Sequence, residues 1–270
     1  MIREDAKTGI IYRKWAAASP KAALLLVHGL GTYGDSWKFA GDFFLKRNIS
    51  SYAVDLRGFG KTRGLRGHVD SFDIYYDDIK ALREIIVREN GPVKIFLTGQ
   101  SMGGVIVFAA SALNPHLFDG TICLAPAFTA KLPFSAVEYA DIFASFFYNG
   151  KKNFNLPFSA EMCTRDTEHQ RAMNSDDLEI RFATSRLLVS IFLAGLRGRF
   201  LKNKIDGPVL FLLAGEDALV SSRACRKVFK GLRTKDKTLI EYPGMHHALN
   251  VELDRDKVFA DIFKWVRDRS

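Results

Sequence analysis

Short apolar segments typical of strands alternate with segments typical of helices along most of this 270-residue chain, and this alternation restricts its fold more than any other feature. The expected strands lie at residues 9–15, 22–27, 51–56, 93–98, 121–125, 209–214 and 238–242. The expected helices lie at residues 35–46, 71–89, 101–113, 222–232 and 254–267. The runs AALLLV (22–27) and VLFLLA (209–214) are apolar at every position, which indicates strands buried on both faces. The pattern predicts an α/β fold whose mostly parallel sheet carries helices on both faces.

Residues 127–203 interrupt this alternation. Segments 135–148, 165–173 and 178–196 are expected to be helices, and no β-branched run of strand length occurs among them. We therefore expect an all-helical insertion, a cap, on a core formed by residues 1–126 and 204–270. The 77 residues of the insertion include 12 Phe or Tyr side chains, enough to bury one face or to line a pocket.

Composition excludes several other classes of protein. The chain is 47% hydrophobic and contains 22 Phe, 3 Trp and 8 Tyr, which rules out intrinsic disorder. With 21 Gly, 8 Pro and no repeat, it is neither collagen-like nor a coiled coil. Its three scattered cysteines predict neither a disulfide framework nor a metal site. A charged N-terminus and the lack of a long apolar stretch favour a soluble, cytoplasmic protein.

The net charge of +9 is concentrated in one part of the chain. Between residues 221 and 237 a single acid, Asp236, accompanies seven basic residues. These are Arg223, Arg226, Lys227, Lys230, Arg233, Lys235 and Lys237. The first four lie on one face of the expected helix, which indicates either a solvated helix face or attraction to an anionic surface such as a membrane. No nucleic-acid motif accompanies the charge, so we expect no nucleic-acid partner.

The segment Gly99-Gln100-Ser101-Met102-Gly103 is the only G-x-S-x-G motif in the chain. It lies between an expected strand and an expected helix. A nucleophilic serine at such a sharp turn needs small neighbours, because its backbone is strained. The first N–H groups of the following helix also point to the position where an oxyanion forms. We therefore predict that Ser101 is a catalytic nucleophile.

A second hydrogen-bond donor for that oxyanion is expected in the segment His28-Gly29-Leu30-Gly31. Its glycines allow the backbone to pass close to Ser101, so that the N–H groups of Leu30 and Met102 can share one cavity. Two such donors stabilise the tetrahedral intermediate of acyl transfer. His28 is expected to brace this loop through hydrogen bonds, and its use as the catalytic base is the less favoured alternative.

A nucleophilic serine requires a base and an acid that orients the base. Asp217 follows an expected strand and therefore lies at the same edge of the sheet as Ser101; we prefer it to Glu216. Two adjacent histidines follow the last expected strand, and both cannot face the serine. We choose His247 over His246 because it is nearer the last helix. No metal or organic cofactor is expected.

Four segments resemble the α/β-hydrolases of the monoacylglycerol lipase and lysophospholipase type, which are classified with the serine aminopeptidases. They are HGLG (28–31), DLRGFG (55–60) continued by Gly67-His68 and Ser71-Phe72, GQSMGG (99–104) and YPGMHHAL (242–249). The match is collinear from about residue 9 to residue 266, and it is loose in the insertion. Residues 32–37 (TYGDSW) depart from the family's usual Glu-His-Ser pattern, which leaves the substrate open.

The resemblance implies an α/β-hydrolase fold with a helical cap over an apolar acyl-chain tunnel. It implies a catalytic triad of Ser101, Asp217 and His247, with structural roles for Asp55, Arg57 and His68. The expected substrate is a lipid ester such as a monoacylglycerol, cleaved through an acyl-enzyme. The cap or the basic helix 222–233 is expected to contact a membrane peripherally. The oligomeric state stays open.

Two alternatives remain at this point. An aminopeptidase would need carboxylates in the cap to hold a substrate ammonium, and six are available. They are Glu138, Asp141, Glu161, Asp176, Asp177 and Glu179. A non-catalytic, ligand-binding relative would normally lack a member of the triad, and none is missing here. A dehalogenase or an epoxide hydrolase is disfavoured because these enzymes carry an aspartate where Ser101 stands.

Overall fold

The computed structural model describes residues 2–270, and its centre is an eight-stranded sheet with the order β1-β2-β4-β3-β5-β6-β9-β10. The strands are β1 (Ile2–Glu4), β2 (Ile11–Trp15), β3 (Ala22–Val27), β4 (Ile49–Val54), β5 (Lys94–Gln100), β6 (Gly120–Leu124), β9 (Val209–Ala214) and β10 (Lys237–Tyr242). β2 is antiparallel to β1 and β4, and all pairings from β4 to β10 are parallel. Parallel strands end at one edge of a sheet, so the loops that follow them meet there.

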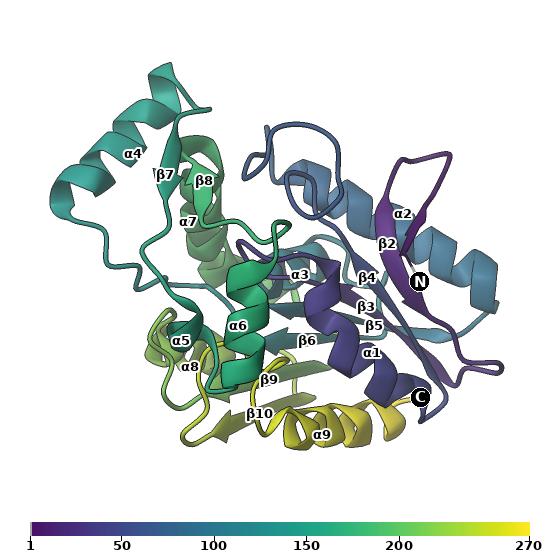
Figure 1. The fold of residues 1–270 in the computed structure, drawn as a ribbon. Helices are drawn as coiled ribbons and strands as arrows, with labels where there is room; N and C mark the ends of the chain where they lie inside the picture. The colour runs from purple at the N-terminus through teal and green to yellow at the C-terminus, as the bar shows by residue number, and fades with distance from the viewer. Residues whose placement is uncertain (1) are drawn as a thin grey trace.

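Helices cover both faces of this sheet (Figure 1). The helices are α1 (Lys38–Leu45) and α9 (Arg255–Arg267) on one face, and α2 (Asp73–Asn90), α3 (Met102–Leu113) and α8 (Ser222–Lys230) on the other. β3, β4, β6 and β9 are buried at every position because both of their faces pack against helices. The predicted α/β fold with a mostly parallel sheet is therefore confirmed.

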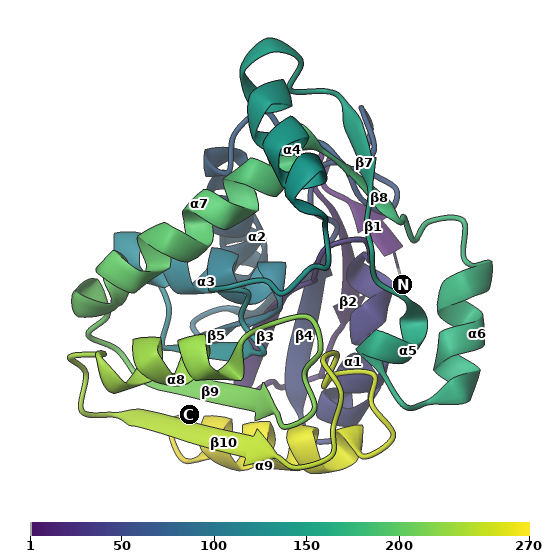
Figure 2. The same ribbon diagram turned by 90° about the vertical axis from the view of Figure 1, so that its left-hand side faces the viewer.

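The segment between β6 and β9 lies outside the sheet and projects from it (Figures 1 and 2). Its elements are α4 (Ala136–Tyr148), β7 (Asn153–Asn155), α5 (Ala160–Cys163), α6 (Thr167–Ser175), β8 (Phe182–Thr184), α7 (Ser185–Leu201) and the 3-10 helix η2 (Lys202–Lys204). In both views α4 extends furthest from the sheet. α7 packs against α3 of the core and against α4, which anchors this cap at one end.

The expectation that the insertion contains only helices is wrong, because β7 and β8 pair as a two-stranded antiparallel sheet. Each strand has three residues, too few to leave a detectable alternation in the sequence. The helix expected over 178–196 instead begins at Ser185 and continues to Leu201. Thr184 sets this start, because its hydroxyl accepts the N–H of Leu187 as an N-cap at 3.3 Å.

Two smaller differences concern the N-terminal part of the chain. The strand β1 was not expected, and the helix expected over 35–46 begins as a 3-10 turn, η1 (Gly34–Trp37), before α1. Within residues 2–270, no helix combines the length and the apolar composition that crossing a bilayer requires.

Candidate active site

Ser101 occupies the single residue between β5 and α3. Its φ of 57° and ψ of −116° are strained for a residue with a side chain. Glycine is required at positions 99 and 103 because other backbone atoms lie too close for a side chain. A Cβ atom on Gly99 would lie 2.3 Å from the carbonyl oxygen of Gly103, and one on Gly103 would lie 2.3 Å from that of Val27. The G-x-S-x-G motif therefore follows from the sterics of a turn that presents the serine side chain.

The backbone of Leu30 and Met102 lies beside this serine. A Cβ atom on Gly29 would lie 3.3 Å from the Cβ of Ser101, so the loop that carries Leu30 passes directly over the turn. Met102 is the first residue of α3, where no carbonyl of the helix can accept its N–H. The N–H of Leu30 donates no hydrogen bond to any residue between 2 and 270. Both groups are thus free to donate to an oxyanion.

His28 braces this loop from beneath. Its Nδ1–H donates to the Gly29 carbonyl at 2.8 Å, and its Nε2 accepts the N–H of Leu56 at 3.0 Å. Complete burial lowers the pKa of the imidazole to about 4, so the ring is neutral near pH 7. With both nitrogens occupied, His28 is not placed to act as the base.

His247 and Asp217 form a hydrogen-bonded pair at the ends of the last two parallel strands. The Nδ1–H of His247 donates to the Asp217 carboxylate at 2.9 Å, and the other Asp217 oxygen accepts the N–H groups of Leu219 and Val220. Burial alone would raise the pKa of the Asp217 carboxyl. The nearby His247 and these hydrogen bonds outweigh it and hold the pKa below its ordinary value.

The alternatives for the base and the acid were His246 and Glu216. The Nδ1–H of His246 donates to the Glu161 carbonyl of the cap at 2.8 Å, which turns the ring away from Ser101. Glu216 is exposed, and the histidines are hydrogen-bonded to other residues, His247 to Asp217 and His246 to Glu161. The structure thus brings the preferred serine, acid and histidine to one edge of the sheet.

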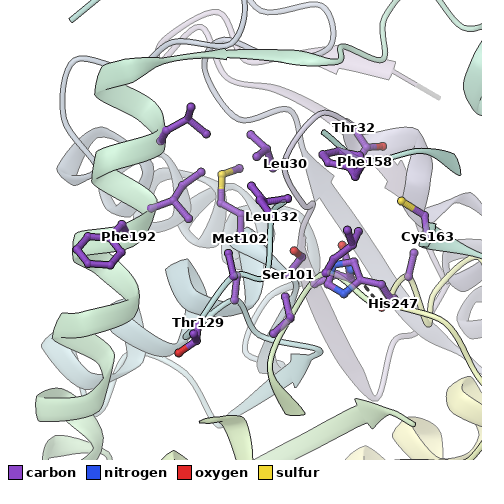
Figure 3. Close-up of a pocket in the computed structure, with 18 of the residues that line it drawn as sticks. Leu30, Thr32, Ser101, Met102, Thr129, Leu132, Phe158, Cys163, Phe192 and His247 are labelled. Carbon is purple, nitrogen blue, oxygen red and sulfur yellow. Dashed lines mark hydrogen bonds between the residues drawn. The ribbon is translucent and has the colours of Figure 1, made fainter. Parts of the chain in front are cut away.

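Ser101 and His247 line one cavity of about 380 Å³, at whose base Figure 3 shows their side chains next to each other. Most of the wall is apolar and comes from the cap. Its main members are Leu132, Phe134, Ile142, Phe143, Leu188 and Phe192. Leu30 and Met102 also line the cavity that Ser101 lines (Figure 3).

The polar side chains of Ser36 and Asn250 also line part of the cavity, and the sequence pattern did not predict them as site residues. Asn250 is buried, and its amide donates to the Ser36 carbonyl at 2.9 Å. Its own oxygen and the Ser36 hydroxyl are buried without a partner within residues 2–270. Buried polar groups are nearly always hydrogen-bonded, so these two atoms are available to a polar group that enters the cavity. The signal in the sequence was the unusual segment 32–37, which contains Ser36.

Glu179 and Arg181 also line the cavity. Glu179 accepts the Thr32 hydroxyl at 3.1 Å and pairs with Arg181 at 3.1 Å. Burial raises the pKa of this carboxyl above its ordinary value, although Arg181 opposes the shift. Cys163 also lines the cavity, but burial raises the pKa of its thiol to about 12, so it is no rival nucleophile.

A serine on a strained strand-to-helix turn, with a histidine and an aspartate after later parallel strands, defines an α/β-hydrolase. Residues 18–254 match the sequence model of the family "Serine aminopeptidase, S33". The chain belongs to this family.

Curated relatives match over nearly the whole chain. The human "Monoglyceride lipase" is 27% identical over 264 residues, which cover 96% of this chain and 86% of that protein. The "Phospholipase YtpA" of Bacillus subtilis is 28% identical over 253 residues, covering 91% and 95%. Among solved structures, the monoacylglycerol lipase of Paleococcus ferrophilus superposes with a TM-score of 0.88 at 24% identity, covering 97% and 99% of the two chains. That likeness supports the fold.

Proposed function

We propose that this protein is a serine hydrolase that cleaves carboxylic esters of the monoacylglycerol type through an acyl-enzyme. The observation that carries the proposal is that Ser101 and the Asp217-paired His247 line one largely apolar cavity that also has polar lining residues. The relatives named as monoglyceride lipases support the same substrate class. The proposal treats residues 127–203 as a cap domain on a core of residues 1–126 and 204–270.

In the first step His247 Nε2 takes the proton of Ser101 as Oγ attacks the ester carbonyl. The N–H groups of Leu30 and Met102 hold the oxyanion of the tetrahedral intermediate. His247 then gives the proton to the leaving alcohol, and the acyl group remains on Ser101. Water, activated by the same nitrogen, releases the carboxylic acid and restores the serine. Asp217 fixes the tautomer of His247 throughout.

The apolar and the polar parts of the lining suit the two halves of such a substrate. The acyl chain fits the apolar wall formed by the cap, where burial of each methylene contributes about 0.8 kcal/mol. The hydroxyl groups of the alcohol can satisfy the buried oxygens of Asn250 and Ser36. A glycerol ester therefore fits the lining better than an ester of an apolar alcohol.

The aminopeptidase alternative is disfavoured by the carboxylates of the cap. Of the six candidates, Glu179 alone lines the cavity within residues 2–270, and Arg181 already neutralises it. Asp141 pairs with Lys152, and Glu138 caps the start of α4 through Ser135. No second carboxylate is left in the cavity for a substrate ammonium.

Replacement of the nucleophile tests the proposal. Ser101→Ala is expected to lower the turnover of a monoacylglycerol by several orders of magnitude and to abolish labelling by a fluorophosphonate probe. Ser111→Ala, in the body of the next helix, serves as the control and should keep both. A parallel assay with a prolyl-naphthylamide covers the peptidase alternative. The proposal would be wrong if the Ser101→Ala variant still hydrolysed the ester, or if the wild type hydrolysed the amide faster than the ester.

We further propose that the cap contacts membranes peripherally, because several large apolar side chains of α4 and α7 are exposed. They are Val137, Tyr139, Phe143, Phe147, Tyr148, Phe192, Leu193 and Phe200. Phe147 and Phe200 are 84% and 80% exposed, which is unusual for phenylalanine. The basic residues of α8 and of the turn after it, within residues 222–233, add attraction to anionic lipid, which salt weakens.

Flotation with lipid vesicles separates the two contributions. We expect more binding to vesicles with anionic lipid than to neutral ones, with the difference lost in high salt. Phe147→Ser combined with Val137→Ser should weaken binding to both kinds of vesicle, whereas Leu65→Ser, an exposed apolar residue of the core, should not. Equal binding by the double variant and the wild type would contradict a role for the cap.

A further inference from the structure

A short stretch of the cap, residues 176–180, crosses the loop that carries one backbone donor of the active site. We call residues 176–180 the strap and residues 28–33 the oxyanion loop. The N–H of Ile180 donates to the Gly31 carbonyl at 2.8 Å. A Cβ atom on Gly31 would lie 2.7 Å from the Ile180 carbonyl oxygen, so the two backbones touch. Leu30 directly precedes this contact in the chain.

Two side-chain hydrogen bonds extend the contact along the oxyanion loop. The Thr32 hydroxyl donates to Glu179 at 3.1 Å, and the Tyr33 hydroxyl donates to Asp176 at 2.5 Å. Burial raises the pKa of the Tyr33 phenol, so the hydroxyl keeps its proton at neutral pH. Three consecutive residues of the loop are therefore each bonded to the strap.

The strap and the segment that follows it are each hydrogen-bonded once more to the core. The Arg66 guanidinium donates to the Asp177 carbonyl at 2.7 Å. The N–H of Thr184, just after the strap, donates to the Gly67 carbonyl at 2.8 Å. The strap can thus hold the oxyanion loop in place.

Leu30 lies between two anchors of different origin. On its N-terminal side the loop is held by His28, which belongs to the core. On its C-terminal side, Gly31 is held by the strap, which belongs to the cap. An oxyanion donor must point to its target within a few tenths of an ångström to be effective, and a displacement of about 1 Å costs much of the rate. Only one of these two anchors comes from the core fold.

We propose that Tyr33 and Asp176 are positioning residues, which join the strap to the oxyanion loop and so hold the N–H of Leu30 in its place for catalysis. The inference rests on the proposed function, because it assumes an oxyanion in this cavity. Neither residue lines the cavity, so neither touches the substrate. The cap then has a second task besides covering the acyl chain: it completes the oxyanion site.

Removal of one oxygen atom tests the contact. Tyr33→Phe should lower kcat about ten-fold and leave KM for the same ester nearly unchanged, because donor geometry acts on the transition state. The matched control is Tyr52→Phe, which also removes a tyrosine–carboxylate hydrogen bond, to Glu89 at 2.9 Å, but far from the cavity. It should affect thermal stability and leave kcat unchanged.

The partner residue provides a rescue test. Asp176→Asn keeps an acceptor oxygen for Tyr33 and should retain most of kcat. Asp176→Ala also removes the acceptor of the Leu178 N–H, at 2.8 Å, and should lose at least as much as Tyr33→Phe. The double variant of Tyr33→Phe with Asp176→Ala should be no slower than Asp176→Ala alone, because the contact between the two side chains is already lost there. Asp177→Asn, an exposed residue of the strap, is the control and should behave as the wild type.

The rate of fluorophosphonate labelling at Ser101 gives a second readout, independent of the substrate. Its phosphoryl oxygen enters the same oxyanion site, so labelling should slow in parallel with kcat. Binding of a non-hydrolysable ether analogue should not change. The inference is wrong if the Tyr33→Phe variant folds, reacts with the fluorophosphonate probe and hydrolyses the ester at the rates of the wild type. The proposed function would still stand in that case. If the wild type itself neither labels nor hydrolyses esters, the proposed function fails first.

Discussion

The Nδ1–H of His247 donates to the Asp217 carboxylate at 2.9 Å in a place where the two side chains are only 5% and 2% exposed. The two residues come from different strand ends, after β10 and after β9, and are 30 positions apart. Because the pair is shielded from water, the carboxylate can both fix the tautomer of the ring and stabilise its charged form. In a position this buried, neither residue can be replaced without consequences for the other.

Asp217→Asn is therefore expected to lower kcat by about 10⁴-fold, because the amide can hold the ring with the proton on the wrong nitrogen. The shape of the side chain hardly changes, so the folded state should persist. Steady-state kinetics with a monoacylglycerol, together with a thermal unfolding curve, would measure both effects. Glu216→Gln, at the exposed neighbouring position, is the control. A loss of less than ten-fold would show that Asp217 is not the partner of the base.

The buried His28 predicts how stability depends on pH. Its pKa is about 4 in the folded protein and near 6.5 in the unfolded chain, so acid favours the unfolded state. The contribution is fully present above pH 6.5 and is lost as the pH falls from there toward 4. It amounts to about 3 kcal/mol at most.

Urea unfolding between pH 7 and pH 4.5 measures this dependence. The free energy of unfolding of the wild type should fall more steeply with acid than that of His28→Phe, which has no group to titrate there. The variant will be less stable at every pH, because the bonds to Leu56 and Gly29 are lost. Parallel curves for the two proteins would show that His28 does not take up a proton on unfolding.

Asn250 predicts selectivity for the alcohol half of the substrate. Asn250→Leu removes the buried oxygen that lacks a partner and offers the cavity an apolar surface instead. We expect kcat/KM for a monoacylglycerol to fall about ten-fold, and that for a p-nitrophenyl ester of the same acyl chain to change little. Comparison of the two substrates is the measurement. An equal loss for both would assign Asn250 to the support of the loop after His247 and not to the alcohol.

The sheet and the sharp turn at Ser101 could be predicted from the sequence because both depend on local patterns. The buried strands β3 and β9 are continuous apolar runs, and the turn at Ser101 is indicated by the glycines on either side of it. The small sheet of β7 and β8 could not be predicted, since its pairing depends on residues nearly thirty positions apart. The polar lining residues Ser36 and Asn250 could not be predicted either, because they are far apart in the sequence and meet only in the folded chain.

The cap wall predicts the preferred length of the acyl chain. Ile142 of α4 is buried and lines the cavity together with side chains of α7. Ile142→Trp places a larger ring in the space that the proposal assigns to the acyl chain, so long chains should lose kcat/KM by about ten-fold or more while short chains are spared. A series of p-nitrophenyl esters of increasing chain length measures this shift. Val137→Trp, an exposed position on the same helix, should leave the profile unchanged, because its side chain points to solvent. A uniform loss across all chain lengths would indicate that the acyl chain lies elsewhere, since only a ligand that reaches Ile142 can sense its size.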